Sequence, residues 1–261
     1  MATAAELLQL AKTHHVAGRL AEAEPFYRAA LAADGSSAEA HFLLGVVCNT
    51  LGRPDEAIAL LARAVAGRPN HVESRHYLAV VLAGRDRLDE AVVHLQEAQR
   101  QDPHSSEILA NLRNVSAARC DAQGQQFAGA GRWEESAACH QEALRLQADY
   151  VPALGNLGNA LKNLGRMDEA EACYRRILEI APNVALAHND LGLIAQAQGQ
   201  LPQAIEHYRR ALELDDNFAE AHTNLGTALA IEGRLDEAES CCRQAIQLKP
   251  ALPDAHQDLG A

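Results

Sequence analysis

Small and apolar residues recur along the chain with a period of 34 residues. Most copies have a leucine followed by a small residue, then a turn residue, and a second small residue five positions after the turn. The turn residues are Gly18, Gly52, Asp86, Gly131, Gly165, Gly199 and Gly233. The small residues that follow are Ala23, Ala57, Ala91, Ser136, Ala170, Ala204 and Ala238. This pattern predicts two closely packed helices in each unit, which must stack on neighbouring units to bury their apolar faces.

The signals at the predicted helix ends agree with this division. Proline follows the second helix at positions 69, 103, 182 and 250, where a ring without an N–H stops a helix. After the turn the chain reads R-x-D-E-A, as in residues 53–57, which places acidic residues in the first turn of a helix. The helix dipole favours acids there, so part of the formal net charge of −12 reflects local helix chemistry.

One step between turn residues, from Asp86 to Gly131, is 45 residues instead of 34, which indicates an insertion of eleven residues at 106–116. Because eleven residues make about three helical turns, the apolar face stays nearly in phase. We predict one long helix, or two helices with a break near Gly124. The insertion would separate an N-terminal three-repeat block, 1–105, from a C-terminal block, 117–261, with four repeats and the start of an eighth. It would act as a hinge or as a simple offset in the stack.

These columns resemble the tetratricopeptide repeat (TPR) family, whose units combine a small residue, a glycine turn, alanines, an aromatic residue and a proline. Tyr27, Tyr174 and Tyr208 supply the aromatic residue in three copies. The seven repeats are 4–37, 38–71, 72–105, 117–150, 151–184, 185–218 and 219–252. The resemblance implies an all-α fold, a right-handed α-solenoid of helix-turn-helix repeats, which presents a concave groove to a protein or peptide partner.

Composition and motifs exclude several other classes of function. The chain has 23 Lys and Arg against 35 Asp and Glu, and 4% aromatic residues, which is not the basic surface that nucleic-acid binding requires. It has no phosphate-binding loop, zinc-protease motif or nucleophile elbow, so we expect neither catalysis nor a cofactor. No signal peptide or membrane-spanning segment stands out, which makes the cytoplasm the expected location. The column formed by Cys139, Cys173, His207 and Cys241 is too widely spaced for one metal ion, and no metal is expected.

The resemblance implies that positions 2, 5, 6, 9, 12 and 13 of each repeat face the groove. Asparagine and aspartate gather there in the C-terminal half, and asparagine amides can both donate to and accept from a peptide backbone. The predicted peptide-binding residues of this half are Asn156, Asn159, Asn189, Asp190, Asn224, Thr227 and Asp258. The corresponding N-terminal positions are more apolar and include Phe42, His76 and Tyr77.

Three functions are consistent with this surface. The first is a protein-interaction scaffold that binds an extended peptide or a partner protein in its groove. The second follows from a likeness of the C-terminal repeats, in strings such as PALGNLGNAL, to the superhelical TPR arm of (bacterial-type) O-linked N-acetylglucosamine transferases. The chain would then be the substrate-recognition arm of a glycosyltransferase whose catalytic domain lies elsewhere. The third is self-association through the end repeats.

Overall fold

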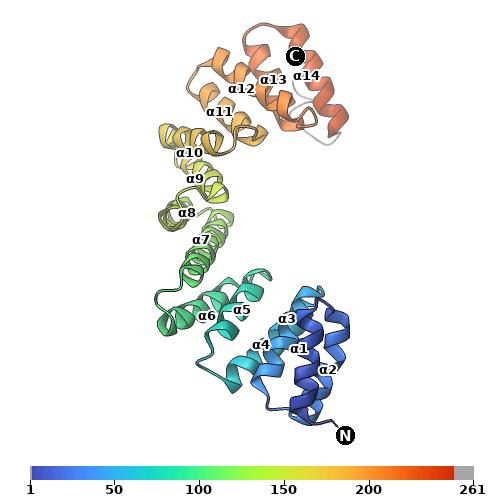
Figure 1. Cartoon of the computed structure of the whole chain (residues 1–261). Coiled ribbons are helices and arrows are strands. Elements are labelled where there is room, and N and C mark those ends of the chain that lie inside the picture. The colour runs from blue at the N-terminus through green and yellow to red at the C-terminus, as the bar shows by residue number, and fades with distance from the viewer. Residues whose placement is uncertain (1, 250–261) are drawn as a thin grey trace. The chain divides into compact units, whose positions relative to one another are not determined.

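All regular secondary structure within residues 2–249, which are the residues that the computed structural model describes, is helical (Figure 1). The first helices of the seven repeats are α1 (Ala4–Val16), α3 (Ala38–Thr50), α5 (Val72–Ala83), α7 (Ser106–Gly129), α9 (Val151–Asn163), α11 (Ala185–Ala197) and α13 (Ala219–Ile231). The second helices are α2 (Leu20–Ala33), α4 (Pro54–Gly67), α6 (Leu88–Gln101), α8 (Trp133–Leu146), α10 (Met167–Ile180), α12 (Leu201–Leu214) and α14 (Leu235–Leu248). The predicted all-α solenoid of helix pairs is confirmed.

The turn between the two helices of each unit has the backbone that its glycine column predicts. The six turn glycines all have positive φ angles, between 72° and 80°. Side chains with a Cβ are strained in this left-handed region, so glycine is favoured there. Asp86 takes the place of the turn glycine in the third repeat, with φ 59°, and aspartate is one of the residues that tolerate this conformation best.

The two helices of a repeat cross where a side chain of the second helix lies against a small residue of the first. A Cβ added at Gly192 would lie 2.5 Å from Cε1 of Tyr208, and one added at Gly158 would lie 2.7 Å from Cζ of Tyr174. The same relation, sixteen residues apart, joins Gly45 to Leu61, Gly124 to His140 and Gly226 to Cys242. We call this arrangement the crossing contact, and it explains the small-residue column of the sequence.

The chain divides into two compact units, one up to Arg119 and one from Cys120 onward, so the boundary lies within α7. This helix has 24 residues and runs through Gly124 without a break, so one long helix is the correct alternative of the two predicted. In the first unit, Ile108 of α7 belongs to the hydrophobic core. In the second unit, Gly124 of α7 makes the crossing contact with α8. The division at 105 and 117 and the hinge stay predictions.

The acidic residues at the start of the second helices form ion pairs with the arginine three positions earlier. Arg87 and Glu90 approach to 2.7 Å, and Arg166 and Glu169 to 2.6 Å. These pairs are exposed to solvent, so each contributes little to stability. They agree with the prediction that part of the negative charge serves local helix structure.

Among the helices of residues 2–249, none has the length and apolar character needed to cross a membrane. The predicted start of an eighth repeat lies outside the described residues.

The crossing contact predicts opposite effects for two glycine-to-alanine substitutions in first helices. Gly192→Ala should lower the free energy of unfolding by about 1–3 kcal/mol, because the new methyl group meets the buried ring of Tyr208. Gly155→Ala is the matched control, since a Cβ there approaches only Cδ1 of Ile177, at 3.8 Å. It should raise stability by about 0.5–1 kcal/mol through helix propensity. Urea unfolding followed by circular dichroism measures both, and a stable Gly192→Ala variant would contradict the packing argument.

Candidate functional site: a pocket between α9 and α11

A pocket of about 260 Å³ lies in the second unit, along the first helices of two successive repeats. Most of its wall is apolar, and three polar side chains complete it. The lining residues are Val151, Pro152, Gly155, Asn156, Asn159, Tyr174, Ile177, Val184, Leu186, Ala187 and Asp190. Leu186 is 57% exposed although it is a large apolar residue. We call this site the α9–α11 pocket, and it contains three of the residues that the sequence predicts for the groove.

The repeat itself brings these polar residues together. Asn156 and Asp190 are separated by one 34-residue period, so they occupy the same position on α9 and α11. Asn159 comes three residues after Asn156 and therefore lies on the same face of α9. Gly155 contributes no side chain, which leaves space beside Ile177. The pocket thus follows from the periodicity together with one glycine.

Asn156 forms a hydrogen bond with a buried carboxylate of the preceding repeat. Its Nδ2 donates to Oδ1 of Asp121 over 3.0 Å. Asp121, on α7, is 3% exposed, lies 2.8 Å from Nδ1 of His140 and accepts a 2.8 Å hydrogen bond from Gln125. Burial by itself would raise the pKa of Asp121, but the close approach of His140 and the hydrogen bonds from Asn156 and Gln125 outweigh it and hold this pKa below its ordinary value of 3.8. Asp121 is therefore a carboxylate at neutral pH.

Asn159 is held by the tyrosine of the crossing contact. The hydroxyl of Tyr174 donates to Oδ1 of Asn159 over 2.9 Å. The tyrosine is 1% exposed, and burial raises the pKa of its hydroxyl, so the donor stays protonated. The buried ring beneath α9 thereby fixes an amide that lines the pocket.

The third polar residue of the pocket is Asp190, whose carboxylate is neutralised by Lys162. Asp190 is 5% exposed, and its Oδ1 lies 2.5 Å from Nζ of Lys162. The same ammonium group sits 5.5 Å from the centroid of the Tyr174 ring, a cation–π contact. A buried carboxylate is tolerated when it is paired in this way. The pocket therefore presents hydrogen-bonding groups and apolar surface without a net charge from this pair.

The other predicted residues of the second half lie outside this pocket. Asn189 is 5% exposed and accepts a 2.8 Å hydrogen bond from Nδ2 of Asn224. The hydroxyl of Thr227 donates to the backbone oxygen of Thr223 over 3.0 Å. Asp258 lies outside the described residues. The predicted polar ladder is thus partly occupied by hydrogen bonds between and within repeats, and its role in binding stays a prediction.

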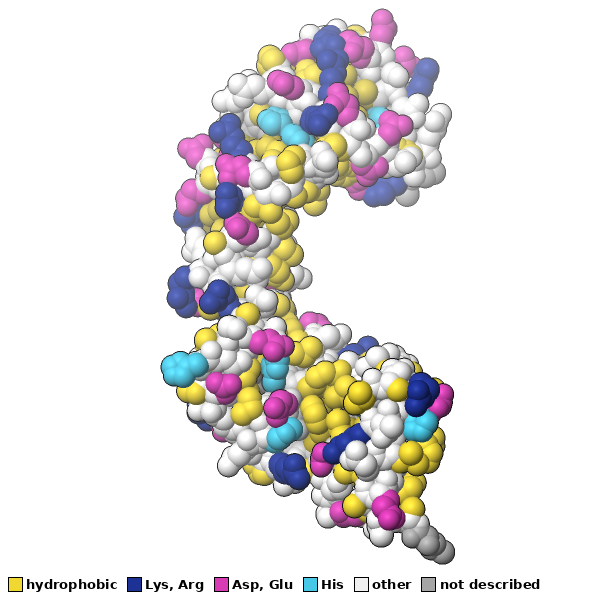
Figure 2. Space-filling model, viewed as in Figure 1, with side chains coloured by type: hydrophobic (Ala, Val, Ile, Leu, Met, Phe, Trp, Pro, Cys, Tyr) yellow, Lys and Arg dark blue, Asp and Glu magenta, His cyan; other side chains and the backbone are white. Residues whose placement is uncertain are grey.

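The N-terminal residues Phe42, His76 and Tyr77 lie in the first unit, where hydrophobic side chains gather on one face (Figure 2). The rings of Phe42 and Tyr77 meet edge to face with centroids 6.2 Å apart. Tyr77 also accepts a 3.3 Å hydrogen bond from Asn49, and Nε2 of His76 lies 2.7 Å from Nδ2 of Asn111. A hollow of about 360 Å³ in this unit includes Phe42 in its lining, but not the other two residues.

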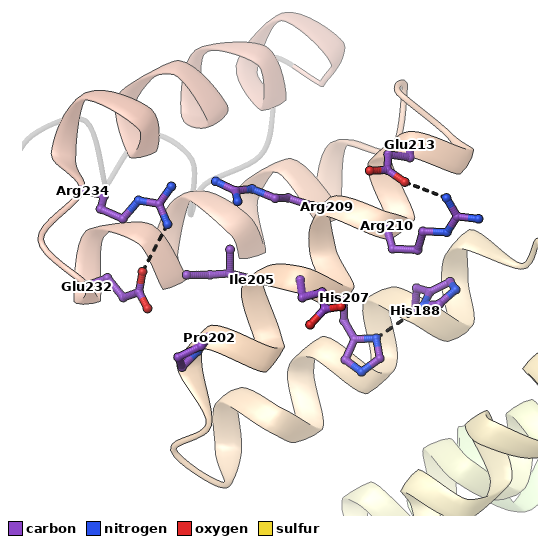
Figure 3. Close-up of a pocket in the computed structure, with 10 residues that line it drawn as sticks. His188, Pro202, Ile205, His207, Arg209, Arg210, Glu213, Glu232 and Arg234 are labelled. Carbon is purple, nitrogen blue, oxygen red and sulfur yellow. Dashed lines mark hydrogen bonds and ion pairs between the residues drawn. The ribbon is translucent and has the colours of Figure 1, made fainter.

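A larger hollow, of about 500 Å³, lies along α12 in the second unit and was not expected from the sequence. Figure 3 shows that its charged residues pair with one another, as Arg210 does with Glu213 and Arg234 with Glu232. Arg209 pairs with Glu237, and the nearest ring nitrogens of His188 and His207 are 3.4 Å apart. Since its arginines are already neutralised, this hollow gives less indication of a ligand than the α9–α11 pocket. No cluster of three or more metal-binding side chains occurs within residues 2–249.

Sequence reasoning missed the residues that hold the pocket amides in place. Asp121 occupies the fifth position of the fourth repeat, but nothing in the sequence indicates that it is buried. Lys162 and Tyr174 were visible as a groove position and an aromatic column, without a link to Asp190 or Asn159. The signal that could have found them is the spacing of 35 residues between Asp121 and Asn156, which joins position five of one repeat to position six of the next.

Family models of the tetratricopeptide repeat match residues 8–72 and 189–253, 149–217, and 49–115. Together with the helix pairs, these matches show that the chain belongs to the tetratricopeptide repeat family. A search of curated proteins finds no matching relative. The more specific likeness to the arm of a glycosyltransferase receives no support from these comparisons.

Two solved structures have the same fold. The C-terminal part of a TPR repeat-containing protein from Cytophaga hutchinsonii is 15% identical, with a TM-score of 0.63, and the match covers 97% of this chain and all of that one. YrrB, described as a TPR protein with an unusual peptide-binding site, is 19% identical, with a TM-score of 0.53. That match covers 77% of this chain and 98% of YrrB. At these identities the likeness extends to the fold.

The lowered pKa of Asp121 predicts a pH dependence of stability. A carboxylate whose pKa is depressed by folding stabilises the folded state above its unfolded pKa, near 3.8, and this contribution is lost as the pH falls through the lower folded value. Asp121→Asn removes this term. Its deficit in unfolding free energy relative to the wild type should therefore shrink as the pH is lowered from about 5 to about 2. Urea unfolding across this range tests it, and a deficit that stays constant would contradict it.

Proposed function

We propose that this chain is a non-catalytic protein-interaction scaffold that binds an extended segment of a partner protein at the α9–α11 pocket. The observation that carries the proposal is the combination of an apolar pocket with two amides, Asn156 and Asn159, on one face of α9. Apolar surface with a few placed polar groups is typical of ligand sites. The amides supply hydrogen bonds for a peptide backbone, and the apolar wall accommodates a side chain.

The size and charge of the pocket favour one apolar side chain as its occupant. Its volume of about 260 Å³ is below the range of roughly 300–1,000 Å³ that holds drug-sized molecules. Its carboxylate, Asp190, is paired with Lys162, so no unpaired charge from this residue attracts a basic group. The exposed Leu186 extends the apolar surface at the rim. A segment with an uncharged, apolar residue at its centre fits these conditions.

The fold comparison supports the same kind of function. YrrB shares the fold and is described as having a peptide-binding site. Tetratricopeptide repeats stack into extended surfaces that other proteins contact. A catalytic role for the chain has no supporting constellation of side chains in its described residues, and binding is the function that the pocket favours.

Filling the pocket should weaken binding without removing any hydrogen bond. A peptide is first selected from a random twelve-residue library displayed on phage, with the wild-type protein as bait. Gly155→Leu places a side chain in the pocket and should weaken binding of this peptide at least about tenfold, which corresponds to about 1.4 kcal/mol. Gly155→Ala is the matched control, since its methyl group meets only Ile177 at ordinary contact distance, and should bind within about twofold. Fluorescence anisotropy measures both.

Two results would count against this site. Equal binding by Gly155→Leu and Gly155→Ala would exclude the α9–α11 pocket and move attention to the hollow that contains Phe42. Failure to select any peptide, together with a sedimentation coefficient that rises with protein concentration, would favour self-association instead.

A further inference from the structure

We propose that Asp121 is a positioning residue that orients the amide of Asn156, so that the α9–α11 pocket offers its ligand the carbonyl oxygen of Asn156. The ligand must then supply an N–H donor at that point. This inference rests on the proposed function and adds to it the polarity of one contact. Asp121 lies outside the pocket lining and acts only through Asn156.

The orientation follows from the chemistry of the two groups. An ionised carboxylate can only accept hydrogen bonds, whereas a carboxamide has one end that donates and one that accepts. Oδ1 of Asp121 is 3.0 Å from Nδ2 of Asn156, so the amide meets the carboxylate with its NH₂ group. A reversed amide would place a carbonyl oxygen against a carboxylate oxygen at hydrogen-bonding distance, which is repulsive. The charge of Asp121 therefore decides which end of Asn156 remains for the ligand.

The carboxylate is locked in this position by its surroundings. Asp121 is 3% exposed, so it cannot turn toward solvent. Its Oδ1 lies 2.8 Å from Nδ1 of His140, and its Oδ2 accepts from Nε2 of Gln125 at 2.8 Å. His140 is itself 1% exposed and packed against Gly124 in the crossing contact of its repeat. The core of the fourth repeat thus fixes the acceptor that fixes Asn156.

Other pairs with the same 35-residue spacing lack this control. Asn224 donates to Oδ1 of Asn189, and Asn111 lies 2.7 Å from a ring nitrogen of His76. A neutral amide or imidazole can present either a donor or an acceptor, so it imposes no direction on its partner. Among the hydrogen-bonded pairs of this spacing in residues 2–249, the one with Asp121 contains a carboxylate. Directional recognition is therefore expected at Asn156.

The test replaces backbone N–H groups of the selected peptide, one at a time, by ester oxygens. With the wild-type protein, one ester should weaken binding about tenfold, because Asn156 loses the donor that it accepts from. With Asn156→Ala, the same ester should bind as well as the parent peptide. With Asp121→Asn, whose neutral side chain no longer dictates the direction of the amide, the ester penalty should fall to about threefold or less. Asn217→Ala, an exposed asparagine between α12 and α13, is the control and should keep the full penalty.

A charge exchange provides a variant that preserves the polarity. In the double variant Asp121→Asn and Asn156→Asp, the new amide at 121 donates to the new carboxylate at 156, which still offers an acceptor to the ligand. Binding and the ester penalty should both return to within about threefold of the wild type. Loss of both in a variant that keeps its helicity would overturn the proposal.

A measurement without peptide keeps the two proposals separate. In the wild-type protein, the side-chain NH₂ protons of Asn156 should exchange with water at least tenfold more slowly than those of the exposed Asn217. In Asp121→Ala this protection should disappear. Protection that survives in Asp121→Ala would overturn the role of Asp121, even if peptides bind. An ester penalty that is the same in the wild type and Asn156→Ala would overturn the predicted polarity while leaving peptide binding intact. If no peptide is selected, the proposed function fails, and the exchange measurement still decides whether Asp121 orients Asn156.

Discussion

The crossing contact within each repeat is the interaction on which the rest of this structure depends. In five of the seven repeats a side chain of the second helix lies so close to a glycine of the first helix that an added Cβ would collide with it. The buried Ala11 and Ala79 take the glycine's place in the other two repeats. This close approach sets the separation of the two helices, and the left-handed turn residue reverses the direction of the chain between them. Because every repeat solves the same packing problem, the first helices of successive repeats present equivalent positions.

The side chains of the crossing contact also form polar contacts with residues of the first helix. The hydroxyl of Tyr174 reaches Asn159, and the hydroxyl of Tyr208 donates to Gln196 over 3.0 Å. In the fourth repeat a histidine takes the place of the tyrosine, and His140 contacts Asp121, which holds Asn156. Buried polar groups need partners, and in these three repeats the partners are residues of the first helix. The orientation of the pocket amides is thus a consequence of how the repeats satisfy their buried polar atoms.

Hydrogen bonds within the protein limit how many residues of the polar ladder are left to bind a ligand. Asn189 and Asn224 bond to each other, and Asp190 is neutralised by Lys162. These contacts stabilise the stack between neighbouring repeats, where an unpaired buried amide would cost about 1–3 kcal/mol. At Asn156 and Asn159 one end of each amide is likewise engaged by the protein, but these two amides line an open pocket. Contacts between repeats and the proposed binding residues therefore share one row of positions, divided repeat by repeat.

The sequence by itself determined the helix pairs, their turns and the first-helix positions at which to look for a site. These features are local or periodic, since a 34-residue spacing and a turn glycine are visible without any long-range contact. The resemblance to the tetratricopeptide repeat family, through its groove positions, also placed Asn156, Asn159 and Asp190 on one surface. Only the tertiary structure decided which amides are engaged, that Asp121 is buried beside His140, and that Lys162 neutralises Asp190. Those facts depend on distances between side chains 15 to 35 residues apart, which the periodicity leaves open.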